Sequence, residues 1–97
     1  MSESSREINR MARAFSALGN PTRLRILQLI TTSDRPLHIK AIARLTKTRY
    51  NSIYKHVKLL EDVGFIQIFE VGRSRVLAVK SPELLERIWE LGRSFTK

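Results

Sequence analysis

Apolar residues near the start of the chain recur at the spacing of one face of an α-helix. Ile8, Met11, Ala12, Phe15 and Leu18 follow one another at i, i+3, i+4, i+7 and i+10, and charged residues occupy the other side. A helix keeps such residues on one stripe because it has about 3.6 residues per turn. The pattern predicts an amphipathic helix over about residues 3–18.

The helical pattern breaks at Gly19, Asn20 and Pro21. Glycine suits a helix C-terminus in the left-handed conformation, asparagine suits an N-cap, and proline suits the first position of a new helix. A second helix is therefore predicted from Pro21 to about residues 31–34. Its leucines and isoleucines lie on more than one face, so we expect it to form the buried centre of the domain.

Two more helices are predicted in the middle of the chain. Residues 35–38 contain a proline that favours an extended backbone, which could add a minor strand to a later hairpin. A short third helix follows over about residues 39–45, and the threonines within residues 46–48 offer a cap for the next helix. The fourth helix is predicted over about residues 49–63, with Gly64 ending it.

The last third of the chain predicts a β-hairpin and a final helix. Residues 65–71 and 75–80 are expected to be strands, with Gly72 and Ser74 in the turn. A helix then starts at Ser81-Pro82 and runs over about residues 82–95. We expect one domain, residues 1–97, mainly α with a small β-hairpin (α+β). The order helix, helix, minor strand, helix, helix, strand, strand, helix is that of a winged helix-turn-helix.

Positive charge is concentrated in the middle of the chain. Seven basic residues and no acidic residue lie between Asp34 and Glu61, and the whole chain has a formal net charge of +9. Long-range attraction of this kind favours phosphates, so we expect double-stranded DNA as the partner. The fourth helix, about 49–63, is predicted to enter the major groove as the recognition helix. The hairpin turn, 72–75, is predicted to contact the minor groove or phosphates as the wing.

The predicted DNA-binding residues lie on the outward side of the fourth helix and at the hairpin turn. Asparagine and arginine can read base edges, and lysine can bind phosphate. Three alternatives remain open: the helix face is only solvated, the tyrosines pack locally, or the hairpin arginines are ordinary surface residues. The predicted set is Arg49, Tyr50, Asn51, Ser52, Tyr54, Lys55, Lys58, Arg73 and Arg75.

Several classes of function are disfavoured by what the sequence lacks. There is no cysteine, which excludes disulfides and thiolate metal sites. No apolar run reaches the ~18 residues needed to cross a membrane. No nucleophile with a base, phosphate loop or metal-ligand set is recognisable. We expect no enzyme, no cofactor, no metal ligands and no membrane contact, in a cytoplasmic, DNA-associated protein. His56 is expected to be a core or interface residue and not a ligand.

Residues 17–27, ALGNPTRLRIL, resemble the opening signature of ArsR-type winged-helix transcriptional regulators. The recognition-helix pattern is similar too, in SIYKHV at 52–57, Leu60 and VGFI at 63–66. Two positions depart from the family: Lys47 replaces a common turn glycine, and Tyr54 replaces a small polar residue. The cysteine and histidine motifs with which relatives bind metals are missing, so metal sensing is not expected. A small-molecule effector remains open.

The apolar stripes of the two terminal helices are predicted to form a homodimer interface. They could instead complete the core of a monomer, but a ~60-residue winged-helix unit has little inner surface to cover them. The ArsR resemblance also implies pairing through helices about 3–18 and 82–95. The predicted interface residues are Ile8, Met11, Ala12, Phe15, Leu84, Leu85, Ile88, Trp89, Leu91 and Phe95.

The sequence therefore predicts a homodimeric, sequence-specific regulator that represses transcription by binding an inverted repeat. Two alternatives are kept. The first is a sequence-tolerant architectural DNA-binding protein, which the net charge of +9 would also suit. The second is a winged helix used as a protein-interaction module. The operator, the regulated genes and the direction of regulation do not follow from the sequence.

Overall fold

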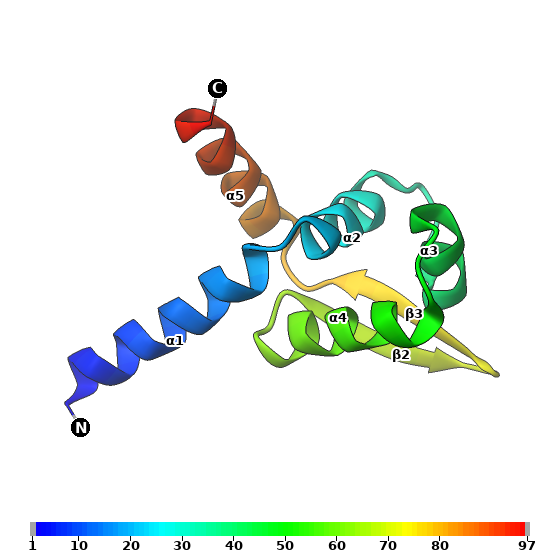
Figure 1. Cartoon of the computed structure of the whole chain (residues 1–97), viewed down its shortest axis with the longest axis horizontal. Coiled ribbons are helices and arrows are strands. Elements are labelled where there is room, and N and C mark those ends of the chain that lie inside the picture. Colours follow the sequence, from blue (N-terminus) through cyan, green and yellow to red (C-terminus); the bar gives the residue numbers. More distant parts are fainter. Residues whose placement is uncertain (1, 97) are drawn as a thin grey trace.

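The computed structural model describes residues 2–96, which form five helices around one small sheet (Figure 1). The elements are α1 (Glu3–Leu18), α2 (Pro21–Thr32), β1 (Leu37–His38), α3 (Ile39–Thr46), α4 (Tyr50–Asp62), β2 (Ile66–Val71), β3 (Ser74–Val79) and α5 (Pro82–Phe95). This is the predicted winged helix-turn-helix order, and the minor strand before α3 is present.

Two helix starts form as their sequences predict. Asn20 caps α2 by accepting a hydrogen bond from the backbone N–H of Arg23 at 3.1 Å, and Ser81 caps α5 through the N–H of Leu84 at 3.2 Å. Each cap satisfies a backbone donor that the helix itself cannot pair. The prediction for Gly19 was wrong, because its φ of −80° is not left-handed.

The predicted threonine cap of α4 was also wrong. The N-cap is Arg49, without a side-chain cap bond, and the hydroxyl of Thr48 donates to the carbonyl oxygen of Thr46 at 3.1 Å. The turn between α3 and α4 instead depends on Lys47, which has φ 53° and ψ 42°. Lys47 thus adopts the left-handed conformation that favours glycine, and the turn keeps its shape without one.

We expect Lys47→Gly to stabilise the protein relative to Lys47→Ala. Both variants remove the same charge, but only alanine keeps a Cβ, which costs about 1–2 kcal/mol in the left-handed region. The advantage of glycine is reduced by about 0.4–1 kcal/mol, because glycine makes the unfolded chain more flexible and so stabilises it. Urea denaturation should place the glycine variant about 0.5–1 kcal/mol above the alanine variant. Equal midpoints would mean that the turn relaxes when residue 47 changes.

The three strands form an antiparallel sheet in the order β1-β3-β2. Ile66 pairs with Val79, Ile68 pairs with Leu77, and Gly72 in the turn has φ 62°. Because side chains alternate across a strand, the face that carries Ile68 and Leu77 turns towards the helices. The hairpin therefore projects as a wing from a base that is held in the core (Figure 1).

The core lies between α2, α3, α4 and the inner face of the sheet. Its buried residues include one that was predicted for the dimer interface, Leu85, which is only 4% exposed. That prediction was wrong, because the first turn of α5 packs onto the protomer's own core. The buried set is Ala17, Ile26, Leu27, Ile39, Ile42, Ile53, Val57, Leu60, Phe65, Ile66, Leu77 and Leu85.

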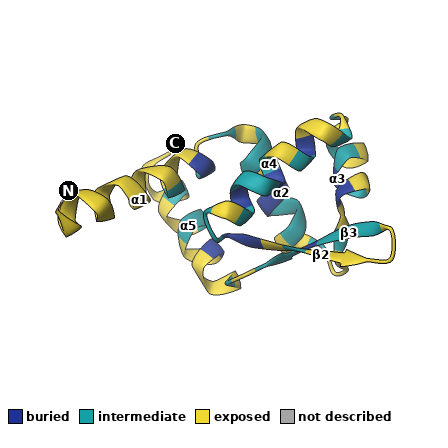
Figure 2. Cartoon of the chain, turned by 90° about the horizontal axis from the view of Figure 1, so that it is seen from below, coloured by how far each residue is buried: buried dark blue, intermediate teal, exposed yellow. Residues whose placement is uncertain are grey.

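Helix α1 extends away from this core, and nearly all of it is exposed (Figures 1 and 2). Only Ala17 is buried, whereas Ile8 is 62% and Phe15 is 59% exposed. On α5 the last turn is similar, with Phe95 at 73%. Most of the other predicted interface residues, Met11, Ala12, Leu84 and Leu91, are exposed as well.

Candidate nucleic-acid interface

Helix α4 divides into an anchored face and a free face. Ile53, Val57 and Leu60 are fully buried, so the rotation of the helix is set by the core. Asn51 and Lys55 then lie on the exposed side, with Ser52 beside them. Asn51, Ser52 and Lys55 are therefore presented to solvent by rigid packing beneath them, whereas Tyr50, Tyr54 and Lys58 are only partly exposed.

Four cations on the turn before α4, on α4 and at the wing tip have no partner among residues 2–96. Lys47, Arg49, Lys55 and Arg73 are all exposed and make no hydrogen bond or ion pair within that part of the chain. Lys47 and Arg49 lie just before α4, Lys55 lies within it, and Arg73 lies at the wing tip. Their charges are not balanced locally, which leaves them available to a polyanion.

Arg75 does not extend freely from the wing as the other hairpin arginine does. Its Nη1 donates to the hydroxyl oxygen of Tyr50 at 3.2 Å, and its Cζ lies 4.7 Å from the ring centroid of Tyr54. Its Nε lies 3.8 Å from a carboxylate oxygen of Glu70. The hydrogen bond to Tyr50 raises the pKa of Arg75. Through these contacts Tyr50 and Tyr54 pack against Arg75 of the same protomer, and β3 is joined to the first turns of α4.

A second link joins the other end of α4 to the wing. Glu61 accepts the backbone N–H of Ile68 at 3.0 Å and pairs with the ammonium of Lys58 at 2.9 Å. The hydrogen bond between Lys58 and Glu61 lowers the pKa of Glu61 and raises the pKa of Lys58. Lys58, predicted to bind phosphate, therefore has an acidic partner within the protomer. With both ends linked, helix and wing form one unit.

A third contact, between α2 and α4, was not predicted from the sequence. Arg23 donates from Nη1 to Nδ1 of His56 at 3.1 Å and from Nε to the carbonyl oxygen of Ala17 at 2.6 Å. Because a guanidinium only donates, His56 must accept at Nδ1 and be neutral. Arg23 therefore connects the end of α1 to α4. The signature at 17–27 contains this arginine, but nothing in its pattern indicates the partner 33 residues away.

We expect the stability of the protein to fall with acid between about pH 6.5 and the lowered pKa of His56. Burial, and then the charge of Arg23, lower that pKa from 6.5. In this window the unfolded chain binds more protons than the folded one, so the free energy of unfolding rises with pH and the contribution is complete above 6.5.

The comparison is with His56→Asn, which can still accept from Arg23 but does not titrate. Denaturation midpoints between pH 5 and 7.5 should depend less on pH in the variant than in the wild type. Parallel pH profiles of the two proteins would contradict the role assigned to His56.

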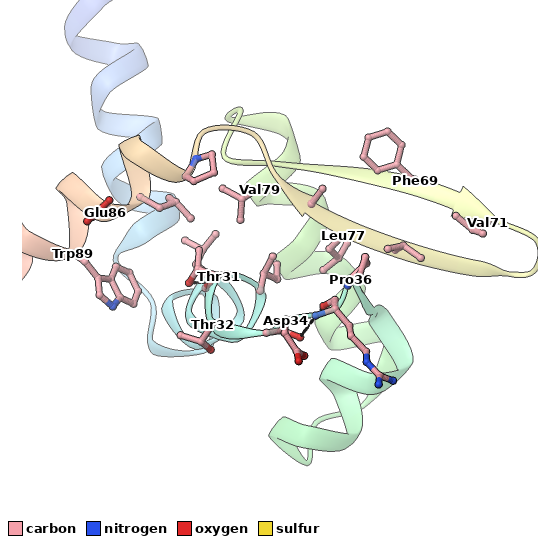
Figure 3. Close-up of a pocket in the computed structure, with 18 of the residues that line it drawn as sticks. Thr31, Thr32, Asp34, Pro36, Phe69, Val71, Leu77, Val79, Glu86 and Trp89 are labelled. Atoms are coloured by element: carbon pink, nitrogen blue, oxygen red, sulfur yellow. Dashed lines mark hydrogen bonds between the residues drawn. The ribbon is translucent and has the colours of Figure 1, made fainter.

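A groove of about 850 Å³ lies between α2, the hairpin and α5, and its lining residues include none from α4 (Figure 3). Phe69 and Val71 line one end and Trp89 lines the other. Two hydroxyls at the groove are used within α2, since Thr31 donates to Leu27 O at 2.9 Å and Thr32 to Gln28 O at 2.8 Å. Trp89 and Ile88 are only partly buried, and both pack against the protomer's own core.

Neither a metal-binding cluster nor a membrane-spanning helix is found among residues 2–96. In that range, no group of three or more His, Cys, Asp or Glu side chains is placed to hold a metal ion. None of the described helices has the length and apolar character needed to span a membrane.

A sequence model described as a helix-turn-helix domain matches residues 18–67. The match covers more than half of the chain, from the end of α1 into β2. The chain belongs to this helix-turn-helix family. No curated protein matches it at a significant level.

Solved structures share the fold over nearly the whole chain. The homodimeric winged helix-turn-helix DNA-binding domain of a possible ArsR-family transcriptional regulator from Mycobacterium bovis has a TM-score of 0.82 and 21% identity, covering 97% of this chain and 84% of that one. HlyU from Vibrio cholerae has a TM-score of 0.74 and 18% identity, covering 100% of both chains.

A third structure, of an ArsR family transcriptional regulator, has 28% identity and a TM-score of 0.68, covering 89% of this chain and 88% of that one. Together with the helix-turn-helix match, these structures confirm the ArsR-type resemblance and the winged-helix fold. Neither departure from the family signature changes the fold, because Lys47 adopts the turn conformation and Tyr54 packs beneath Arg75.

Proposed function

We propose that the protein is a homodimeric, sequence-specific DNA-binding transcriptional regulator that represses by occupying an inverted repeat. The observation that carries the proposal is the set of four exposed cations that have no partner among residues 2–96 and lie just before α4, on α4 and at the wing tip. Helix α4 itself is anchored by the core and linked to the wing at both ends. A rigid cationic helix beside a cationic hairpin fits the major groove and the adjacent backbone.

The residues of α4 and the wing have different proposed roles. Arg49 and Asn51 lie at the start of the helix, the part that reaches base edges, where bidentate contacts to guanine and adenine give ~1–3 kcal/mol of discrimination. Ser52 and Lys55 follow on the exposed side. Arg73 contacts the minor groove or flanking phosphates from the wing tip. Lys58 contacts phosphate while it also pairs with Glu61.

Dimerisation through α1 and α5 is supported by the exposed apolar residues on both helices. A helix with Ile8, Met11 and Phe15 in water would be unfavourable for a protomer alone. The M. bovis neighbour is a homodimer and shares the fold. A two-fold axis between the terminal helices would present two copies of α4 to half-sites about 34 Å apart.

The test is selection of bound duplexes from a random pool with the purified protein. We expect one enriched inverted repeat with half-site centres about one helical turn apart, bound ~10³-fold or more tightly than random duplex. If the protein binds duplexes but no common sequence is enriched among them, the result would support the architectural alternative. Failure to bind any duplex at low salt would support the protein-interaction module.

A further inference from the structure

The contact between Arg75 and Tyr50 determines which hydrogen-bonding group Tyr50 can offer. The five N–H groups of a guanidinium donate and none of its atoms accepts. At 3.2 Å from Nη1 of Arg75, the hydroxyl oxygen of Tyr50 is therefore the acceptor. Its own hydrogen must point elsewhere, and no other residue in the range 2–96 accepts it.

The geometry points to Tyr50 as a hydrogen-bond donor to DNA, with Arg75 as the positioning residue that sets this polarity and does not itself contact the duplex. This inference rests on the proposed function. It assigns the DNA group that Tyr50 contacts to one chemical class, the acceptors. These are phosphate oxygens, purine N7, guanine O6 and thymine O4, whereas the amino groups of adenine and cytosine are donors.

The placement of Tyr50 favours this role. It is the first residue of α4, the end of a recognition helix that lies closest to the bases. Its ring is partly buried against the core, which restricts the directions in which the hydroxyl can point. A hydroxyl whose ring and oxygen are both held loses little freedom when it binds.

Arg75 is held in its place by two other groups besides Tyr50. Its guanidinium stacks on the ring of Tyr54, with 4.7 Å between Cζ and the centroid, and its Nε faces Glu70 at 3.8 Å. Lysine keeps the charge but lacks the planar fork that makes these contacts together. Arg73 has no partner in residues 2–96 and provides a matched arginine on the same hairpin.

The experiment measures binding of wild type, Tyr50→Phe, Arg75→Lys and the double variant to the selected operator and to random duplex. Tyr50→Phe removes only the hydroxyl, and we expect operator affinity to fall about 3- to 10-fold. Arg75→Lys should cause a loss of the same kind, and the double variant should be no weaker than the weaker single variant. Arg73→Lys is the control, and its loss should multiply with that of Tyr50→Phe.

Two arms identify the acceptor. If it belongs to a base, the loss is confined to the operator and disappears when the contacted purine is replaced by its 7-deaza analogue or the base pair is exchanged. If it is a phosphate, operator and random duplex lose affinity equally. Either result supports the donor role.

The inference is overturned if Tyr50→Phe binds every duplex as the wild type does, or if the losses from Tyr50→Phe and Arg75→Lys multiply. Multiplication would mean that Arg75 contacts DNA independently. Both results presuppose a wild type that prefers its operator. A wild type that binds no duplex is a different outcome, since the proposed function then fails as well.

Discussion

Replacing Phe15 by glutamate is expected to convert the protein to a monomer and to lower operator affinity by about 100-fold or more. Phe15 is 59% exposed on α1 and is not part of the protomer's core. Burying a phenylalanine contributes about 1.5–3 kcal/mol, and two-fold symmetry doubles the effect of one substitution. The expected loss of about 3–6 kcal/mol weakens dimerisation by roughly 10²–10⁴-fold.

Operator affinity falls when the dimer dissociates, because the two copies of α4 are then no longer linked. In a dimer, binding of one half-site raises the effective concentration at the other, which increases affinity by about 10²–10⁴-fold. Mass by light scattering and duplex titration measure the two effects. The control is Arg13→Gln, which changes the charge by the same amount at an exposed position about 200° around the helix. Leu91→Glu on α5 should reproduce the effect of Phe15→Glu. If both variants remain dimers, the proposed interface through α1 and α5 is wrong.

The paired substitution Arg49→Gln and Lys55→Gln is expected to weaken binding to random duplex by about 10³-fold at roughly 0.15 M salt. Binding to the operator should fall by at least as much, because Arg49 is also proposed to read guanine. Both cations are exposed and without partners in residues 2–96. If a dimer neutralises ~6–10 phosphates, log K falls with log salt at a slope of about −5 to −9. Removing four phosphate contacts per dimer makes this slope less steep by about 3.6. If the plots of log K against log salt for the wild type and the variant meet near 1 M, affinity at roughly 0.15 M differs by ~10³-fold.

The matched control is Arg13→Gln with Arg87→Gln, which removes the same charge from exposed positions on α1 and α5. Long-range attraction depends on net charge, so the control should lower affinity slightly and leave the slope nearly unchanged. Equal slopes for the wild type and the Arg49/Lys55 variant would show that α4 does not lie against the phosphates.

Local features of the chain predicted nearly all of the secondary structure. The spacing of Ile8, Met11 and Phe15 indicated α1, and the caps at Asn20 and Ser81 marked two helix starts, because both signals act within a few residues. Gly64 and Gly72 have positive φ where a helix end and a turn were expected. The errors at Gly19 and Thr48 are also local, since several cap geometries can satisfy the same helix end.

The sequence by itself determined the helices, the hairpin and the cationic middle of the chain, because periodicity, capping and charge are properties of neighbouring residues. Only the tertiary structure decided which groups are engaged. Leu85 is buried, Arg75 turns to Tyr50, and Arg23 bonds His56. These contacts join residues 25 or 33 positions apart, and they depend on the angles at which helices and strands pack. Hydrophobic periodicity shows that a helix face is apolar, but not which chain will cover it.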